Sequence, residues 1–296
     1  MNLAHVRFGS VEIDRVARPH GIATAKAVPA ARVRTDKEPS SQPYGDFLPW
    51  VLQRAGLDSS WYRAAPLERR VPACLRALKV STVHEARFGI SGDARLLEIA
   101  VGALLNGTTE FFRDRPVFDF LAREVLPALA ARDGSIRAWS AGCSSGAELY
   151  SIAIQLDELG LLERGVLLGT DCRPDAIEQA AAATYGDTAL AKLPPAVRAR
   201  YFEPIAGHWR AIARLRHSIE WRVEDLASAT PEGAWDLILW RNAGMYVQPD
   251  AAASTLLRLI ARLKPGGYLV LGKAERPPVR LDVKPVAHCV YQRSVQ

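Results

Sequence analysis

The sequence predicts an α/β protein built around a doubly wound parallel sheet, and three features indicate this. An apolar stretch at residues 136–141 ends in the small residues 142–146, and a helical segment follows. A second apolar stretch at 165–171 follows that helix, so strand, helix and strand form a parallel unit. The alternation resumes with a strand at 235–242 and a helix from about Asp250 to Leu263, and a turn at 264–267 then leads into a strand at 268–272.

Length and composition favour a globular enzyme. The chain has 296 residues, of which 49% are hydrophobic and 24% charged, enough for one large domain or two modest ones. It has neither an apolar run long enough to cross a membrane nor the apolar core of a secretory signal, so we expect a cytoplasmic protein with no membrane insertion. The four cysteines lack metal-ligand spacing, and neither a metal site nor a disulfide framework is predicted.

The net charge of +6 favours acidic partners or anionic ligands. The basic residues of the helical segment are dispersed and are not interleaved with aromatic residues, so we predict no nucleic-acid partner. These residues are Arg63, Arg69, Arg70, Arg76 and Lys79. They form either an ordinary solvated helix face or a docking site for an acidic protein.

The pattern divides the chain into four parts. Residues 1–44 lack periodicity and end in a proline-rich linker, so we expect a poorly ordered tail. Residues 45–105 have apolar positions at helical spacing and predict a small helical domain, in which Pro66 and Pro72 begin or kink helices. Residues 106–133 form a connector and a helix. Residues 134–296 carry the sheet, interrupted at 184–217 by an insertion with short strands, and end in an antiparallel hairpin.

Open α/β sheets bind ligands at the carboxyl ends of their strands. The turn after Ser140, then Asp171, Asp225 and Asn242, all fall at that edge. The turn lacks the three glycines of a dinucleotide site, so it is either the site of a cofactor other than NAD or a tight packing turn. Asp171 either accepts hydrogen bonds from both ribose hydroxyls of an adenosine-containing ligand or caps the helix that starts near Pro174.

Four segments, in this order and spacing, resemble the CheR-type chemoreceptor glutamate methyltransferases, which use S-adenosylmethionine. The resemblance covers roughly residues 45–293. Its most specific parts are Thr109-Glu110-Phe111-Phe112-Arg113-Asp114, the turn from Ser140 to Gly146 leading to Tyr150-Ser151-Ile152-Ala153, Arg241-Asn242 with Tyr246, and Pro265-Gly266-Gly267-Tyr268.

The resemblance implies a Rossmann-like methyltransferase sheet with a small all-helical N-terminal domain and a small inserted β-subdomain. The cofactor would be S-adenosyl-L-methionine, with S-adenosyl-L-homocysteine as product. The acceptor would be a glutamate in the cytoplasmic helical region of chemoreceptors. The resemblance also assigns docking to the helical domain, and we expect a monomer.

The resemblance further implies roles for individual residues. Arg113 and Tyr246 would be catalytic, with Arg113 near the reacting centre and Tyr246 where the acceptor carboxylate enters. The cofactor-binding set would be Thr109 and Arg113 at the methionine part, Ala141 and Glu148 around the turn, Asp171 at the ribose, Asp225 and Leu226 at the adenine, and Arg241 and Asn242 along the pocket. Without the resemblance, the sequence favours a surface salt bridge for Arg113 and a core aromatic with a satisfied hydroxyl for Tyr246.

The chain departs from the family pattern at several positions. Ala147 stands where an acid is usual, Gly107 where Asn is frequent, and Ala274 where Ser is usual. Three hypotheses follow: an active receptor methyltransferase, a binding module that keeps the fold but transfers methyl groups poorly, and a nucleic-acid methyltransferase suggested only by the positive charge. The Asn-Pro-Pro-aromatic signature of the third is absent after the fourth strand.

Overall fold

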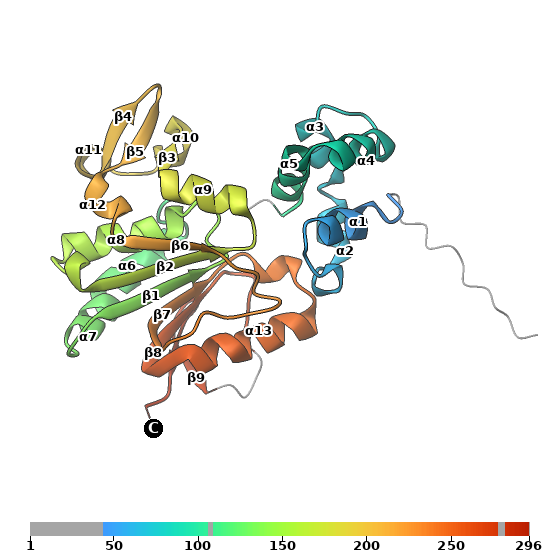
Figure 1. Ribbon diagram of the computed structural model, residues 1–296. Helices are drawn as coiled ribbons and strands as arrows, with labels where there is room; N and C mark the ends of the chain where they lie inside the picture. Colours follow the sequence, from blue (N-terminus) through green and yellow to red (C-terminus); the bar gives the residue numbers. More distant parts are fainter. Residues whose placement is uncertain (1–43, 106–108, 278–281, 296) are drawn as a thin grey trace, which may run out of the picture. The chain divides into compact units, whose positions relative to one another are not determined.

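A computed structural model describes residues 44–105, 109–277 and 282–295 (Figure 1). The expected tail at 1–44 and the departure at Gly107 therefore fall almost entirely outside the described residues. In the part that is described, no helix is long and apolar enough to cross a membrane.

The helical region precedes the sheet in the sequence and has its own apolar core. Its helices are α1 (Phe47–Arg54), α2 (Ala64–Glu68), α3 (Val71–Ala77), α4 (Val83–Gly92) and α5 (Ala94–Leu104), with the 3-10 turn η1 (Ser59–Trp61). The side chain of Thr82 accepts a hydrogen bond from the Glu85 amide and so caps α4, as serine and threonine do at helix starts. Pro72 lies in the first turn of α3, where proline is tolerated, so it begins a helix and does not interrupt one.

The connector continues directly into a helical stretch. It consists of α6 (Arg115–Phe120), the π-helical turn η2 (Leu121–Val125) and α7 (Leu126–Ala130). Pro127 follows the π-helical turn inside this continuous stretch, where it has no amide to donate to the preceding turn. The segment packs its apolar side against the sheet through Val117, Phe118 and Leu121.

The main sheet has the strand order β6-β2-β1-β7-β8-β10-β9 within the described residues. Its strands are β1 (Ile136–Ala141), β2 (Gly165–Asp171), β6 (Ile219–Val223), β7 (Trp235–Trp240), β8 (Leu263–Leu271), β9 (Val283–Ala287) and β10 (Val290–Arg293). The pairs β1·β2, β1·β7, β2·β6 and β7·β8 are parallel, and β10 is antiparallel to both of its neighbours. The order reverses between β1 and β7, the position where open α/β sheets bind ligands.

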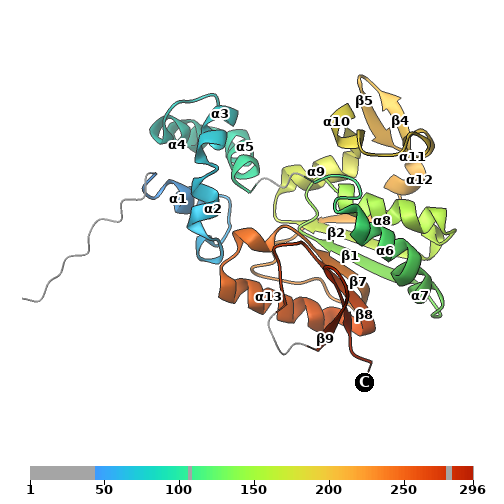
Figure 2. The ribbon, with the colours of Figure 1, turned by 180° about the vertical axis from the view of Figure 1, so that it is seen from behind.

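Helices cover both faces of the sheet, as Figures 1 and 2 show. Ala138, Leu167 and Leu239 share one buried cluster with α8 (Ala147–Glu158) and with the α6–α7 segment. The other buried cluster, which contains α13 (Pro249–Arg262), takes a directly adjacent residue from each of the same strands. These residues are Trp139, Leu168 and Ile238. Successive strand residues point to opposite faces, so strands buried on both sides read as unbroken apolar runs. The helix α9 (Pro174–Ala182) packs against β2 and β6.

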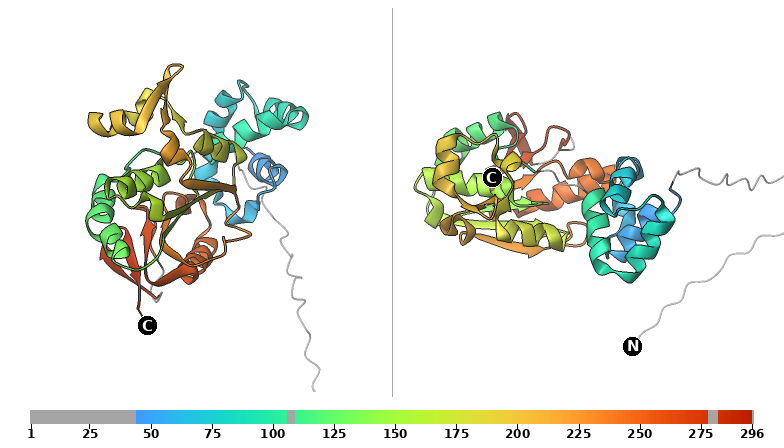
Figure 3. Two further views of the ribbon diagram at one scale, coloured as in Figure 1. Left: turned by 60° about the vertical axis from the view of Figure 1, so that its left-hand side comes forward. Right: turned by 90° about the horizontal axis from the view of Figure 1, so that it is seen from above.

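The insertion forms a separate three-stranded sheet in the order β3-β5-β4 (Figure 3). It contains β3 (Thr184–Tyr185), α10 (Asp187–Leu190), α11 (Pro195–Tyr201), β4 (Phe202–Ile205), β5 (His208–Ala211) and α12 (Ala213–Arg216). Phe111 of the connector makes edge contacts with Tyr185 and Phe202, with ring centroids 4.9 and 5.2 Å apart. These contacts join the insertion to the segment that carries Arg113.

The predicted fold class is confirmed, with one local difference. The sequence Lys264-Pro265-Gly266-Gly267 is predicted as a turn before a strand, but β8 runs through it. Gly266 takes φ +69°, and the pairing of β7 with β8 shifts register between Trp235 and Leu237. The glycine therefore permits a bulge inside the strand, which is a common use of glycine in a sheet.

Candidate functional site

Several residues at the carboxyl edge of the sheet have left-handed backbone angles. Phe112, Asp114, Ser144 and Asn242 have φ between +50° and +60°, although none is glycine. Such conformations are uncommon for residues with a Cβ and persist where surrounding contacts hold them. They lie in the connector motif, in the turn after β1 and directly after β7, which are three of the four segments singled out from the sequence.

These segments line a cleft. Of the residues nominated from the sequence, its walls contain Thr109, Arg113, Glu148, Asp171, Asp225, Leu226, Arg241, Asn242 and Tyr246. Ala141 is not among the lining residues. Its side chain is 1% exposed and packs in the core on the α13 side of the sheet, so only its backbone is near the turn.

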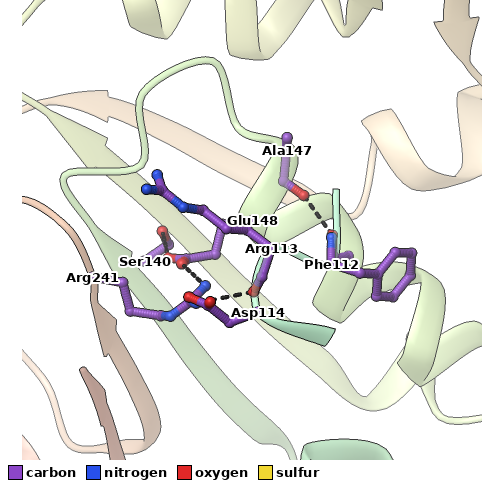
Figure 4. Close-up of polar contacts among 8 residues, drawn as sticks. Phe112, Arg113, Asp114, Ser140, Ala147, Glu148 and Arg241 are labelled. Carbon is purple, nitrogen blue, oxygen red and sulfur yellow. Dashed lines mark hydrogen bonds and ion pairs between the residues drawn. The ribbon is translucent and has the colours of Figure 1, made fainter. Parts of the chain in front are cut away.

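Arg241, directly after β7, holds three parts of the site together (Figure 4). Its Nη1 donates to Oε2 of Glu148 at 3.0 Å, and its Nη2 donates to the carbonyl of Arg113 at 2.9 Å and to Oδ2 of Asp114 at 2.8 Å. The guanidinium lies 5.5 Å from the ring centroid of Phe118. Its side chain is only 1% exposed, so these contacts serve as a positioning clamp.

Glu148 and Asp114 are each held by a second group. The Ser140 hydroxyl donates to Oε1 of Glu148 at 2.9 Å, and Lys273 pairs with Asp114 at 2.5 Å. Although burial opposes it, Lys273 and Arg241 keep the pKa of Asp114 below its usual value. Asp114 is therefore held as an anion beside the cleft, and Glu148 is held in place by Ser140 and Arg241.

Ala147 lies where the family usually has an acid, but it does not line the cleft. Its side chain is 1% exposed and belongs to the apolar cluster under α8. The cleft acid of this helix is its neighbour, Glu148. Replacement of the usual acid by alanine therefore leaves the carboxylate of the cleft in place.

Asp171 ends β2 and binds the turn after β1. Its Oδ2 accepts from the Ser144 amide at 2.9 Å, and its Oδ1 accepts from the amide of Arg173 at 3.0 Å and from Nε of Arg173 at 3.1 Å. The N-cap of α9 is Arg173, so the helix-cap alternative for Asp171 is wrong. These three contacts occupy most of the about four acceptor positions of a carboxylate, and the expected hydrogen bonds from both ribose hydroxyls stay a prediction.

Met245 and Tyr246 connect this cleft to a second hollow. The second hollow is lined by Arg63, Pro66, Arg69, Arg70, Met245 and Tyr246. Arg76 and Lys79 are not among its lining residues. Three of the five basic residues noted in the sequence therefore lie together beside Tyr246.

Several cleft residues were missed by sequence reasoning. The helical region supplies Trp61, Tyr62 and Leu105, and the segment after β2 supplies Cys172 and Arg173. The only sequence signal for the last two is their position directly after Asp171. No local pattern could place the first three at the carboxyl edge of a sheet whose first strand begins only at Ile136.

The residue types of the cleft fit S-adenosylmethionine. Glu148, Asp171 and Asp225 are acids suited to an ammonium group, to hydroxyls and to a positively charged sulfur, and Arg113 suits a carboxylate. Leu226 and Trp240 offer apolar surface, and the buried Nε1 of Trp240 lacks a hydrogen-bond partner among the described residues. A ligand with a flat base, hydroxyls and a zwitterionic end matches this set.

Comparison with known proteins decides the family. Residues 107–289 match the family model described as CheR methyltransferase, SAM binding domain. The chain belongs to the CheR methyltransferase family. It is 36% identical over 191 residues to chemotaxis protein methyltransferase 1 of Pseudomonas aeruginosa, covering 61% of this chain and 70% of that protein. It is 32% identical over 249 residues to chemotaxis protein methyltransferase 1 of Vibrio cholerae, covering 80% of this chain and 90% of that protein.

The chain is also similar, at lower identity, to solved structures of methyltransferases. A TehB-like SAM-dependent methyltransferase from Corynebacterium glutamicum is 15% identical with a TM-score of 0.35, covering 62% of this chain and 96% of that one. The N-methyltransferase NodS from Bradyrhizobium japonicum, in complex with S-adenosyl-L-homocysteine, is 16% identical with a TM-score of 0.33, covering 56% and 67%.

The CheR family assignment and its cofactor, both predicted from the resemblance, are confirmed by the family match. This CheR protein is an S-adenosylmethionine-dependent methyltransferase. The roles of individual residues stay predictions, although all the nominated residues except Ala141 line the same cleft.

Proposed function

We propose that this CheR protein transfers a methyl group to glutamate side chains in the helical region of chemoreceptors. The carrying observation is that Met245 and Tyr246 line both hollows, so an arginine-lined surface opens next to the cofactor cleft. A positively charged approach favours an acidic acceptor. The names of its relatives, which are chemotaxis protein methyltransferases, support the same assignment.

The chemistry asks little acid–base work of the protein. When bound, S-adenosylmethionine supplies a methyl group already activated by its attachment to a positively charged sulfur. A glutamate carboxylate is ionised near neutral pH, so it would take the methyl group without losing a proton, and the electron pair of the methyl–sulfur bond would stay on sulfur. The chain must align the two groups and exclude water.

Each lining residue has a part in this alignment. Thr109 and Arg113 hold the methionine part, Asp171 holds the ribose, and Asp225 with Leu226 holds the adenine. Tyr246 guides the acceptor carboxylate from the arginine-lined hollow. Arg241 and Glu148 act through their ion pair, which fixes the connector motif against α8.

The alternative of a poorly active binding module finds less support. It depended on Ala147, which lies in the core and not on the cleft wall, and on Gly107, which lies outside the described residues. The acids and Arg113 expected at an active site all line the cleft. We further propose that the protein works in the cytoplasm as a monomer.

A transfer assay with methyl-labelled cofactor tests the proposal. Purified protein is incubated with receptor-containing membranes from the source organism, and labelled receptor is treated with mild base. A carboxyl methyl ester releases its label as methanol, whereas N-methyl groups keep it. Peptide mapping should then find the ester on glutamates of the helical region. Base-stable label, or cofactor binding without label on receptors, would contradict the proposal.

A further inference from the structure

Tyr62 and Arg63, which follow the 3-10 turn η1, form a short extended segment that joins the helical region to the acceptor side of the cleft. Tyr62 and Arg63 have β-region backbone angles. The Arg63 amide donates to the Tyr246 carbonyl at 2.8 Å, and the Gln248 amide donates to the Trp61 carbonyl at 2.8 Å. Tyr62 and Val247 thus form an antiparallel bridge.

The bridge holds Tyr62 at the wall of the cofactor cleft. Its side chain lines the cleft together with Trp61, and the residue is only 6% exposed. Its hydroxyl lies 3.9 Å from Sγ of Cys172, the residue after Asp171. A thiol is a weak hydrogen-bond partner, so this contact uses little of the bonding capacity of a buried phenol.

The surroundings keep this phenol protonated. Burial raises the pKa of Tyr62, and Cys172, Asp225 and Asp171 raise it further. Burial likewise raises the pKa of the Cys172 thiol to about 12. Tyr62 is therefore a hydrogen-bond donor beside the two carboxylates to which we assign the ribose and the adenine.

We propose that Tyr62 binds the adenosine part of the cofactor, its ring forming one side of the adenosine pocket and its hydroxyl donating to a ribose oxygen or a ring nitrogen. The helical region then has a part in cofactor binding in addition to docking. This inference rests on the cofactor positions assigned above, with Asp171 and Asp225 at the adenosine end.

Tyr62→Phe tests the proposal because it removes only the hydroxyl. Calorimetric titration of the full chain with S-adenosyl-L-homocysteine should show a Kd about three- to tenfold higher, the scale of one neutral hydrogen bond. Titration with 5′-methylthioadenosine, which lacks the amino-acid part, should show the same fold-change. Under saturating cofactor kcat should be unchanged, while KM for the cofactor rises. Tyr44→Phe, the same change in the helical region outside the cleft, is the matched control.

The outcomes separate the possible failures. An unchanged Kd in a folded Tyr62→Phe protein overturns the proposal, and a lowered Tm with unchanged Kd assigns Tyr62 to packing alone. A loss seen with S-adenosyl-L-homocysteine but not with 5′-methylthioadenosine also overturns it, because the contact would then be to the amino-acid part. A wild-type chain that binds neither compound would overturn the cofactor site itself, and Tyr62 with it.

Discussion

Arg241 and Glu148 form an ion pair at 3.0 Å between the end of β7 and the first turn of α8, with side chains 1% and 12% exposed. The same guanidinium binds the carbonyl of Arg113 and the carboxylate of Asp114. Three segments far apart in the sequence are therefore fixed by one side chain. Removing a partner from such a buried network leaves charges uncompensated, which is the costly case.

We expect Arg241→Lys to destabilise the fold by about 2–4 kcal/mol and to weaken cofactor binding. A lysine ammonium cannot reproduce the planar fork that serves Glu148, Asp114 and the Arg113 carbonyl together. Urea unfolding and calorimetric titration measure the two effects. Arg115→Lys, in an exposed pair with Asp119, should change stability by no more than about 0.5 kcal/mol. Equal stability of the two variants would show that Arg241 is not a clamp.

Asp171→Ala should weaken cofactor binding by about 1–3 kcal/mol, the scale of a lost charge-assisted hydrogen bond. It should also lower Tm, because the carboxylate holds the amides of Ser144 and Arg173. Titration with S-adenosyl-L-homocysteine and thermal melting separate the effects. Glu178→Gln, on the exposed side of α9, is the control. Unchanged affinity in folded Asp171→Ala would remove Asp171 from the cofactor site.

Arg113→Lys and Tyr246→Phe should each lower kcat about 10- to 100-fold, the scale expected when reacting groups are misaligned. Both side chains line the cleft and neither is fully buried, so Tm should change little. Single-turnover transfer to receptor fragments measures the rate. Variants that unfold would instead assign these residues to the structure.

Glu275→Gln should stabilise the protein at neutral pH by about 1–2 kcal/mol. The residue is 6% exposed, and neither carboxyl oxygen has a hydrogen-bond partner in the described part of the chain. Burial raises the pKa of Glu275 above the ordinary value of a glutamate, although nearby backbone amides, such as that of Asn242, oppose the shift. Folding therefore favours the protonated form of Glu275. The loss of folding stability caused by ionising this carboxyl is absent at acid pH and grows as the pH rises through the raised pKa.

The advantage of Glu275→Gln should accordingly shrink as the pH falls towards 4.5. Chemical unfolding across pH 4–8 measures this dependence. The exposed Glu98→Gln change on α5 should show none of it. A variant that is less stable than wild type at neutral pH would mean that the ionised carboxylate is held by favourable contacts.

Methyl transfer at low receptor concentration should fall as salt rises, because exposed charges are screened. Arg63→Glu and Arg69→Glu, beside Tyr246 in the second hollow, should mimic that loss without raising the Kd for S-adenosyl-L-homocysteine. Arg70 also lines this hollow but is less suitable for charge reversal, since its Nε donates to the Ala103 carbonyl at 2.9 Å. Arg76→Glu, outside the hollow, is the control. Rates indifferent to salt and to both reversals would leave these arginines as an ordinary solvated face.

Local patterns predicted most elements because their signals are short-range. The apolar runs of β1, β2 and β7, the proline at the start of α3 and the final antiparallel pair can all be read within a few residues. The bulge at Gly266 could not, since a proline–glycine–glycine run is a turn signal unless a neighbouring strand pairs across it. The aromatic contact of Phe111 with the insertion likewise depends on how distant segments pack.

The sequence by itself determined the α/β class, the family and the carboxyl edge at which Asp171 and Asn242 lie, because strand alternation and motif spacing are properties of the chain. Only the tertiary structure decided which side chains share a cleft. It placed Tyr62 of the helical region beside Cys172. It also placed Arg241 where its guanidinium binds Glu148, and it buried the Ala147 side chain in the core while Glu148 lines the cleft. Such contacts join residues up to 128 positions apart, and no local periodicity encodes them.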